Sequence, residues 1–377
     1  MEIYLDNSAT TRICSEAAEK MIDVINNVYG NPSSLHTKGQ EAEAEIKAAR
    51  RAVADSLGVS DKEIFFTSGG TEANNLAVFG AAWARRKRGN KIVTTAVEHS
   101  SVFESCKELE NEGFEVAYLL PEKNGCISEE QLSEAIDENT ILVTVMMVNN
   151  ETGAVFPVEC IRRIVEKKNA PALIHCDAVQ AYGKTSVKPY KIGCDLLTVS
   201  AHKIHGPKGS GALFVKKGTH IKPIHYGGEQ EMKLRPGTEA LPLIAGFGAA
   251  AANIGDVREN YIKMWNLRDY AAKRLLAIDG VALNSPANSL PYILNVSALG
   301  VRSETMLHHL EKRNVYISSG SACAKGKASH VLSALGLPVE RQDSALRISF
   351  SKFSNEKEVD ELAAAIEEGL RTLVKKN

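Results

Sequence analysis

Short apolar runs alternate with amphipathic stretches along most of this chain. Runs of this length are typical of buried strands, and the stretches between them place apolar residues at helical spacing. Strands alternating with helices predict a mainly parallel sheet with helices on both faces. The run 141–148 is the most apolar and predicts a central strand, whereas 116–120 predicts a strand nearer an edge. The other strands of this sheet are expected at residues 64–67, 91–95, 172–176, 196–199 and 212–215.

Helical patterns precede, separate and follow these strands. The clearest ones cover residues 16–27, 39–57 and 75–83, and a long one covers about 246–276. Beyond it, a different arrangement begins, with strands expected at 292–296, 315–318 and 345–350 and helices at 303–312 and 356–374. We therefore expect two domains that pack tightly: a large one over residues 16–259, and a smaller α+β domain built from residues 1–15 and 260–377.

Length and composition agree with this division and exclude several classes of protein. A chain of 377 residues is long enough for one large and one smaller core. A net charge of −1 gives no overall field that favours nucleic acid or an anionic membrane. No apolar run approaches the roughly 20 residues of a membrane span, and the N-terminus lacks the basic flank of a signal peptide. We expect a cytoplasmic protein with no nucleic-acid or membrane partner.

The cysteines do not form a recognisable framework. There are seven, an odd number, widely scattered and without a Cys-x-x-Cys pair. This pattern argues against both a set of disulfides and a structural zinc site, so no metal site is expected. Most of the cysteines are expected to be small buried or half-buried thiols, and Cys176 is expected to fill space within a predicted strand.

Polar side chains recur directly after the predicted strands. Residues 68–74 follow the first strand, and His99, Asn150, Asp177 and Lys203 each follow a later one. Open α/β sheets bind ligands beyond the carboxyl ends of their strands. The sequence therefore predicts one ligand site at this edge of the sheet.

The residue types suit pyridoxal 5′-phosphate, which needs a lysine, a carboxylate at its ring nitrogen, an anion cradle and a stacking partner. Lys203 stands between two histidines and ahead of a glycine-rich turn, and a partly desolvated lysine is neutral often enough to form a Schiff base. Asp177 would face the ring nitrogen, His99 would stack on the ring, and Gln180 would donate to its phenolic oxygen. A helix start would bind the phosphate through Gly70, Thr71, Ser200 and His202.

Each of these residues has an ordinary alternative interpretation. Lys203 could be a surface lysine in a turn, Thr71 and Asp177 could simply cap helices, and His99 could be a satisfied histidine at a strand end. Arg347, within the strand 345–350, could belong to a surface ion pair. It is the combination of these residues in one α/β framework that favours a cofactor site.

The same residues carry a family resemblance. In order, the matching segments are 4–11, 29–34, 66–75, 97–101, 148–153, 175–180, the segment around Lys203, 234–238 and 318–323. Together they resemble the NifS/IscS-type cysteine desulfurases, which are class-V, aminotransferase-like enzymes of fold type I. The resemblance implies a large domain with a mainly parallel seven-stranded sheet flanked by helices, plus a smaller α+β domain.

The resemblance also implies roles for individual residues. Lys203 would hold pyridoxal phosphate and move the α-proton of L-cysteine, with His99 as a second catalytic residue. Asn150 would contact both cofactor and substrate. The substrate carboxylate would bind Arg347, whose fork matches its two oxygens, with Asn31 also among the substrate-binding residues. Thr238 would reach the phosphate from the partner subunit of a homodimer.

Cys323 differs from the other cysteines. The stretch 318–327 is small and polar, which indicates an exposed thiol, and Lys325 and Lys327 would favour the nucleophilic thiolate. By the resemblance, this thiolate attacks the substrate sulfur, alanine leaves, and a persulfide remains on Cys323. The sulfur would then pass to an acceptor protein for iron–sulfur cluster biogenesis, another thio-cofactor or tRNA thiolation. The segment between Cys323 and His330 is shorter and more basic than in many relatives that build clusters, and the chain lacks their C-terminal tail, which leaves the acceptor open.

Three alternatives remain at this point. A selenocysteine lyase or an aminotransferase could share the fold and cofactor, although transamination has no use for the thiol of Cys323. A catalytically idle sulfur-relay or scaffold protein could keep the fold alone, against which Lys203, Asp177 and His99 argue.

Overall fold

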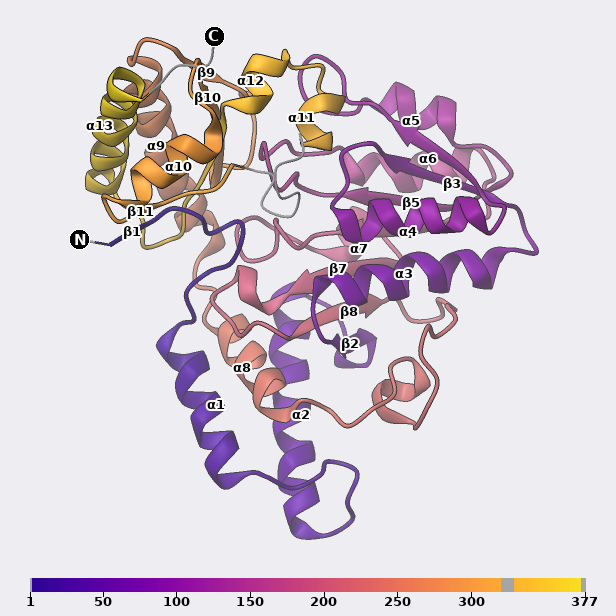
Figure 1. The fold of residues 1–377 in the computed structure, drawn as a ribbon. Coiled ribbons are helices and arrows are strands. Elements are labelled where there is room, and N and C mark those ends of the chain that lie inside the picture. Colours follow the sequence, from indigo (N-terminus) through magenta and orange to yellow (C-terminus); the bar gives the residue numbers. More distant parts are fainter. Residues whose placement is uncertain (1, 320–328, 374–377) are drawn as a thin grey trace.

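The computed structural model describes residues 2–319 and 329–373. Figure 1 shows a large sheet with helices on both faces, next to a smaller group of strands and helices that contains β1 and α13. The predicted α/β class with a mainly parallel seven-stranded sheet is confirmed.

The large sheet has the strand order β2-β8-β7-β6-β5-β3-β4. β5 is buried along its whole length and lies between β6 and β3, and β4 forms one edge, as their sequences predict. The neighbours from β7 to β4 pair in parallel, whereas β8 is antiparallel to both β7 and β2. The strands are β2 (Ile64–Thr67), β3 (Lys91–Thr95), β4 (Glu115–Leu119), β5 (Thr140–Met146), β6 (Leu173–Asp177), β7 (Leu196–Ser200) and β8 (Gly211–Val215).

A hydrophobic core lies on each face of this sheet. Successive side chains of a strand point to opposite faces, so one strand contributes to both cores. In β8, Leu213 joins a hydrophobic core with α3 (Gly70–Arg85) and α4 (Ser100–Asn111). Its neighbour Phe214 joins the larger core on the other face. The sequence pattern locates α3 but begins it five residues too late, at residue 75 instead of Gly70.

The remaining helices of this part of the chain lie around the sheet in Figure 1. They are α1 (Ser15–Asn27), α2 (Thr37–Leu57), α5 (Glu129–Ala135), α6 (Ile161–Lys167), α7 (Pro189–Ile192) and α8 (Leu241–Ala252), with 3₁₀ turns at Asp61–Glu63, Val158–Cys160, Ala201–Lys203 and Gln230–Lys233. Within the described residues, no helix combines the length and apolar character that a membrane span requires.

The predicted continuous helical pattern at 246–276 is wrong at one point. α8 ends at Ala252, and a separate helix, α9 (Val257–Leu276), follows after a short break. Gly255 in this break has φ +80°, a conformation that favours glycine. Asp256 then caps α9 by accepting hydrogen bonds from the backbone N–H groups of its first turn.

The smaller group of elements surrounds a three-stranded antiparallel sheet with the order β12-β10-β9. The chain start belongs to this group, because β1 pairs in parallel with β11. The domain boundary that we expect between residues 259 and 260 falls inside α9 and stays a prediction. The elements are β1 (Ile3–Tyr4), β9 (Val281–Leu283), β10 (Ile293–Ala298), α10 (Ser303–Glu311), β11 (Val315–Tyr316), α11 (His330–Ala334), α12 (Val339–Asp343), β12 (Ala345–Ser349) and α13 (Glu356–Thr372).

A short segment after β1 joins the two parts of the molecule. Asp6 forms a bridge with Ser349 at the end of β12. A few residues further on, the backbone N–H of Thr11 donates to the carbonyl of His202 at 2.9 Å. Residues 6–11 therefore run from the smaller sheet to the end of β7, where Lys203 lies.

Candidate active site

A cavity of about 690 Å³ lies where the carboxyl ends of the parallel strands meet the segment after β1. Met146 and Asp177, at the ends of β5 and β6, contribute to its wall, and Arg347 of β12 reaches it from the smaller sheet. It brings together most of the residues that the sequence singles out: Gly70, Thr71, His99, Asn150, Asp177, Gln180, Ser200, His202, Lys203 and Arg347.

Lys203 ends the 3₁₀ turn that follows β7. Its Nζ donates to the carbonyl oxygen of Ala9 at 2.8 Å and to that of Ser8. The surrounding backbone is fixed by Thr11, whose hydroxyl donates to the carbonyl of His202 at 3.0 Å. The amine of Lys203 is thus held at the cavity wall by the segment after β1.

Asp177 stands at the end of β6 and is nearly buried, with 6% of its surface exposed. Its Oδ2 accepts from Asn74 Nδ2 at 2.7 Å, and its Oδ1 accepts from the backbone N–H of Val179 at 2.9 Å. Asn74 Nδ2 also donates to Ser101 Oγ, which lies 2.8 Å from His99 Nδ1. One hydrogen-bond network therefore fixes the carboxylate and the imidazole together.

His99 caps α4, because its Nδ1 accepts the backbone N–H of Ser101 at 3.2 Å. Burial lowers the pKa of His99; the charges of Lys203 and His330 act in the same direction, and Asp177 opposes them. The ring is therefore neutral near pH 7 and, with Nδ1 as an acceptor, carries its proton on Nε2.

The start of α3 offers a place for an anion. The hydroxyl of Ser200 is buried and has no hydrogen-bond partner among the described residues. Gly70 lies beside it, and a Cβ at this position would come within 3.0 Å of Val179 Cγ2. Lys208 and the first residues of α3 line a second hollow of about 500 Å³ that shares Gly70 and Ser200 with the main cavity. A helix N-terminus, a lysine and an unpaired hydroxyl together favour a phosphate group.

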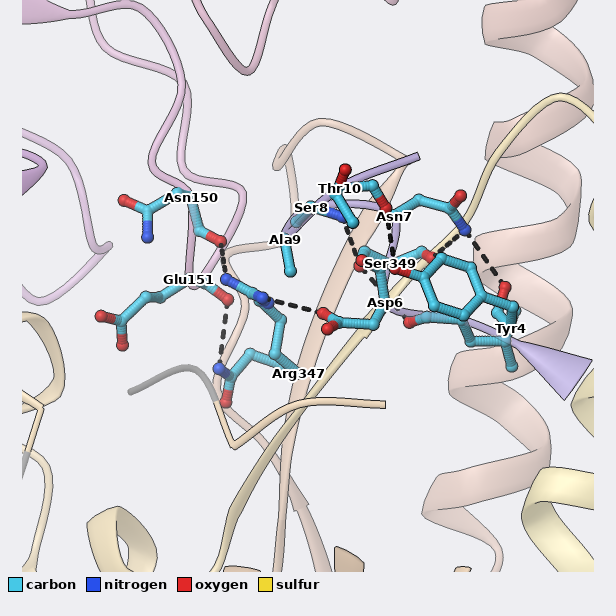
Figure 2. A network of polar contacts seen from close by, with 12 residues as sticks. Tyr4, Asp6, Asn7, Ser8, Ala9, Thr10, Asn150, Glu151, Arg347 and Ser349 are labelled. Carbon is cyan, nitrogen blue, oxygen red and sulfur yellow. Dashed lines mark hydrogen bonds and ion pairs between the residues drawn. The ribbon is translucent and has the colours of Figure 1, made fainter. Parts of the chain in front are cut away.

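Arg347 lies at the opposite side of the cavity. Its Nη2 donates to Asp6 Oδ1 at 2.9 Å, and its Nη1 donates to the carbonyl oxygen of Asn150 at 3.0 Å (Figure 2). With 3% of its surface exposed it is not part of a surface ion pair, which was the alternative interpretation. Its Nε and the Oδ1 of Asn150 are buried and lack partners within residues 2–319 and 329–373.

Comparison with known proteins agrees with this geometry. The family model for class-V aminotransferases matches residues 3–362. The chain belongs to the class-V aminotransferase family. It is 39% identical over 375 residues to a cysteine desulfurase IscS from Methanosarcina thermophila, which covers 98% of this chain and 92% of that protein.

Solved structures give the same relationship. A NifS-like protein superposes with a TM-score of 0.93 at 39% identity, covering 99% of this chain and all of that one. SspA in complex with cysteine superposes with a TM-score of 0.81 at 33% identity, covering 94% of this chain and all of that one. The resemblance to NifS/IscS-type proteins is confirmed, and this member of the class-V aminotransferase family is a pyridoxal-phosphate-dependent enzyme.

The cavity fits that cofactor. It offers a primary amine at Lys203, a buried carboxylate at Asp177 and, at the start of α3, the unpaired hydroxyl of Ser200. Burial and the charges of Lys203 and Lys208 lower the pKa of His202 to about 3, so His202 would meet a phosphate as a neutral hydrogen-bonding group.

Three predicted site residues are not placed in the cavity. Asn31 and Thr238 are exposed and do not line it in this single chain. Cys323 lies outside the described residues, as do Lys325 and Lys327. The roles proposed for these residues therefore stay predictions.

The structure also adds site residues that the sequence interpretation missed. Asn74 lies about one helical turn after Gly70 on α3, so the periodicity of that helix could have located it. Glu151 follows Asn150 and is a buried carboxyl of the cavity wall, where its Oε2 accepts from Ser329 Oγ at 2.6 Å. Burial raises the pKa of Glu151 to about 7, against the effects of Ser329 and Arg347.

Asn74→Ala is expected to weaken cofactor binding. The change removes the hydrogen bond to the Asp177 carboxylate, and hydrogen bonds to charged groups contribute about 1.5–3 kcal/mol, which predicts a rise of roughly 10- to 100-fold in the Kd of pyridoxal phosphate. Equilibrium dialysis measures this Kd. Asn75→Ala is the matched control, because Asn75 donates to the carbonyl of Ser101 and not to Asp177. Equal affinities for the two variants would contradict the prediction.

Glu98 predicts a pH dependence of stability. It is buried beside His99 behind the cavity, and burial raises its pKa to about 8, although Met146 N–H and Thr95 Oγ1 donate to it. The folded-state pKa of Glu98 lies above its unfolded value near 4.5. The contribution of Glu98 to the unfolding free energy is therefore complete below pH 4.5 and is lost as the pH rises toward 8. Glu98→Gln removes this contribution.

Urea unfolding between pH 5 and pH 8 tests the effect of Glu98. The unfolding free energy of the wild type is expected to fall with rising pH more steeply than that of Glu98→Gln, by roughly 1 kcal/mol per pH unit. Parallel pH profiles for the two proteins would show that Glu98 is already ionised in the folded state.

Proposed function

We propose that this enzyme converts L-cysteine to L-alanine and holds the released sulfur as a persulfide on Cys323. The observation that supports this proposal most is that one cavity is lined by the amine of Lys203, the carboxylate of Asp177 and the guanidinium of Arg347. The family supports this reaction, since the relatives include a named cysteine desulfurase and a structure with cysteine bound.

Several residues of the cavity each have their own role in the proposed reaction. When bound, pyridoxal phosphate supplies a sink for the electron pair released at the α-carbon of the substrate. Asp177 keeps the ring nitrogen protonated, and Asn74 holds its carboxylate in place. Lys203 Nζ takes the α-proton of cysteine, and His99 carries a proton at Nε2.

Arg347 binds the substrate carboxylate. Two of its nitrogens are already used by Asp6 and Asn150, whereas Nε, buried beside the cavity, is the donor that lacks a partner in the described part of the chain. A carboxylate oxygen at this position would satisfy it, since a buried charge without partners is costly. Asn150 offers its side-chain amide to the same group.

The sulfur transfer balances without an external oxidant. The thiolate of Cys323 attacks the substrate sulfur, so that a new S–S bond forms while the Cβ–S bond of cysteine breaks. The electron pair of that bond stays with the carbon skeleton, which takes up a proton to become the methyl group of alanine. One thiol and one cysteine thus yield one persulfide and one alanine.

Several finer features belong to the same proposal. The enzyme acts as a homodimer in the cytoplasm, with Thr238 of each exposed loop serving the cofactor phosphate of the other subunit. The persulfide sulfur passes to an acceptor protein, for iron–sulfur cluster biogenesis or a thiolation reaction.

The direct test mixes purified holoenzyme with L-cysteine and measures alanine and sulfide, with and without dithiothreitol. We expect alanine in both cases, and continued turnover with free sulfide only when the reductant discharges the persulfide. 3-Mercaptopyruvate in place of alanine would instead indicate transamination. A much higher rate with selenocysteine would indicate a lyase for that amino acid, and no alanine from cysteine would refute the proposal.

A further inference from the structure

Lys184 is a buried lysine to which the proposed reaction gives no role. Only 6% of its surface is exposed, and it ends the turn that follows β6. The preceding Gly183 has φ +73°, and a Cβ there would lie 2.7 Å from Ile204 Cγ2. Glycine therefore lets this turn pack against the segment that carries Lys203, and both lysines line the same small cavity of about 30 Å³.

The ammonium group of Lys184 has few partners for a buried charge. Its Nζ donates to Gln180 Oε1 at 3.1 Å and lies 5.9 Å from the centroid of the Tyr292 ring. Within the described ranges, no carboxylate forms a salt bridge with it. Burial lowers the pKa of Lys184 to about 7, and the charges of Lys203 and Arg347 act in the same direction. Such a costly group beside a ligand site is a candidate for a function.

A relay of hydrogen bonds joins the two lysines. Gln180 Nε2 donates to the carbonyl oxygen of Ser8 at 3.0 Å, and the same oxygen accepts from Lys203 Nζ. A carbonyl has no proton to donate, so the amide nitrogen of Gln180 must face Ser8 and its amide oxygen must face Lys184. Lys184 supplies the donor that this orientation requires.

The orientation matters because Gln180 also lines the active-site cavity. Its amide group carries two N–H donors, of which Ser8 takes one, so the other can bind an oxygen of the cofactor. We propose that Lys184 is a positioning residue that fixes the Gln180 amide with its nitrogen toward Ser8 and the cofactor. This inference rests on the proposed function.

Lys184→Met tests the proposal. The variant keeps an unbranched side chain, one heavy atom shorter, but leaves Gln180 Oε1 without its donor, so only the hydrogen bond to Ser8 still orients the amide. We expect the Kd for pyridoxal phosphate to rise about tenfold, as for the loss of a hydrogen bond to a charged group. The unfolding temperature of the apoprotein should stay the same or rise, because a buried charge is replaced by an apolar group. Lys188→Met, at an exposed lysine on the following segment, is the matched control and should bind the cofactor as the wild type does.

A double-mutant cycle separates positioning from a structural role. If Lys184 acts through Gln180, adding Lys184→Met to Gln180→Ala should weaken cofactor binding no further. Additive effects, a wild-type Kd for Lys184→Met, or weaker binding together with a lower unfolding temperature would each overturn the proposal. The proposed function fails separately, if the wild-type holoenzyme makes no alanine from cysteine.

Discussion

Replacing Lys203 by alanine is expected to lower alanine formation from cysteine roughly 10³-fold or more, because the variant loses both the amine that holds the cofactor and the base that moves the α-proton. We expect this activity to fall because the reacting amine is missing, and not because the variant fails to fold. Lys203 Nζ donates to the backbone carbonyl oxygens of Ser8 and Ala9, which stay in place when the side chain is shortened.

Two measurements check the Lys203 prediction. Alanine production is followed with excess pyridoxal phosphate, and borohydride treatment is followed by analysis of the cofactor that remains attached to the protein. The wild type should retain the cofactor covalently, and Lys203→Ala should not. Lys217→Ala, at an exposed lysine after β8, is the matched control with expected wild-type behaviour. An alanine variant at 203 that worked at the parental rate would remove the basis of the proposed mechanism.

Cys323→Ser is expected to reduce sulfide release by roughly 10²-fold or more while cofactor binding stays intact, since serine lacks the nucleophilic thiolate that accepts sulfur. In the wild type, mass spectrometry should find one added sulfur atom on the peptide that contains Cys323. Cys126→Ser serves as the control, because Cys126 is half-buried, donates to the carbonyl of Val155, and does not line the active-site cavity. An added sulfur on another cysteine, with activity retained in Cys323→Ser, would assign the acceptor role elsewhere.

Much of the large domain is predictable from the sequence. The strand β5 is an almost continuous apolar run with clear polar limits, and burial on both faces of a parallel sheet favours that pattern. The short helix α5 and the strand β9 escape notice because each has few apolar positions from which a period could be inferred. The break between α8 and α9 was detectable in principle, since a glycine and a capping aspartate mark it.

Some residues of the candidate site are likewise predictable from the sequence, and others are not. Lys203, Asp177 and His99 lie at or shortly after strand ends, and the parallel sheet gathers those ends at one edge. Lys184 carries no comparable signal, because its burial results from how a turn packs against distant residues such as Tyr292. The pairing of Arg347 with Asp6 is also a tertiary contact, and the alternative of a surface ion pair could be rejected only once its burial was known.

The link between Asp6 and Arg347 has a consequence for synthesis on the ribosome. The two residues are 341 positions apart, so the chain must emerge from the exit tunnel as far as Arg347 before they can meet. The nascent sheet can form earlier, because domains fold as their sequences appear. The proposed substrate site is therefore completed only after Arg347 has emerged, and a product truncated before Arg347 would have the large sheet without this part of the cavity.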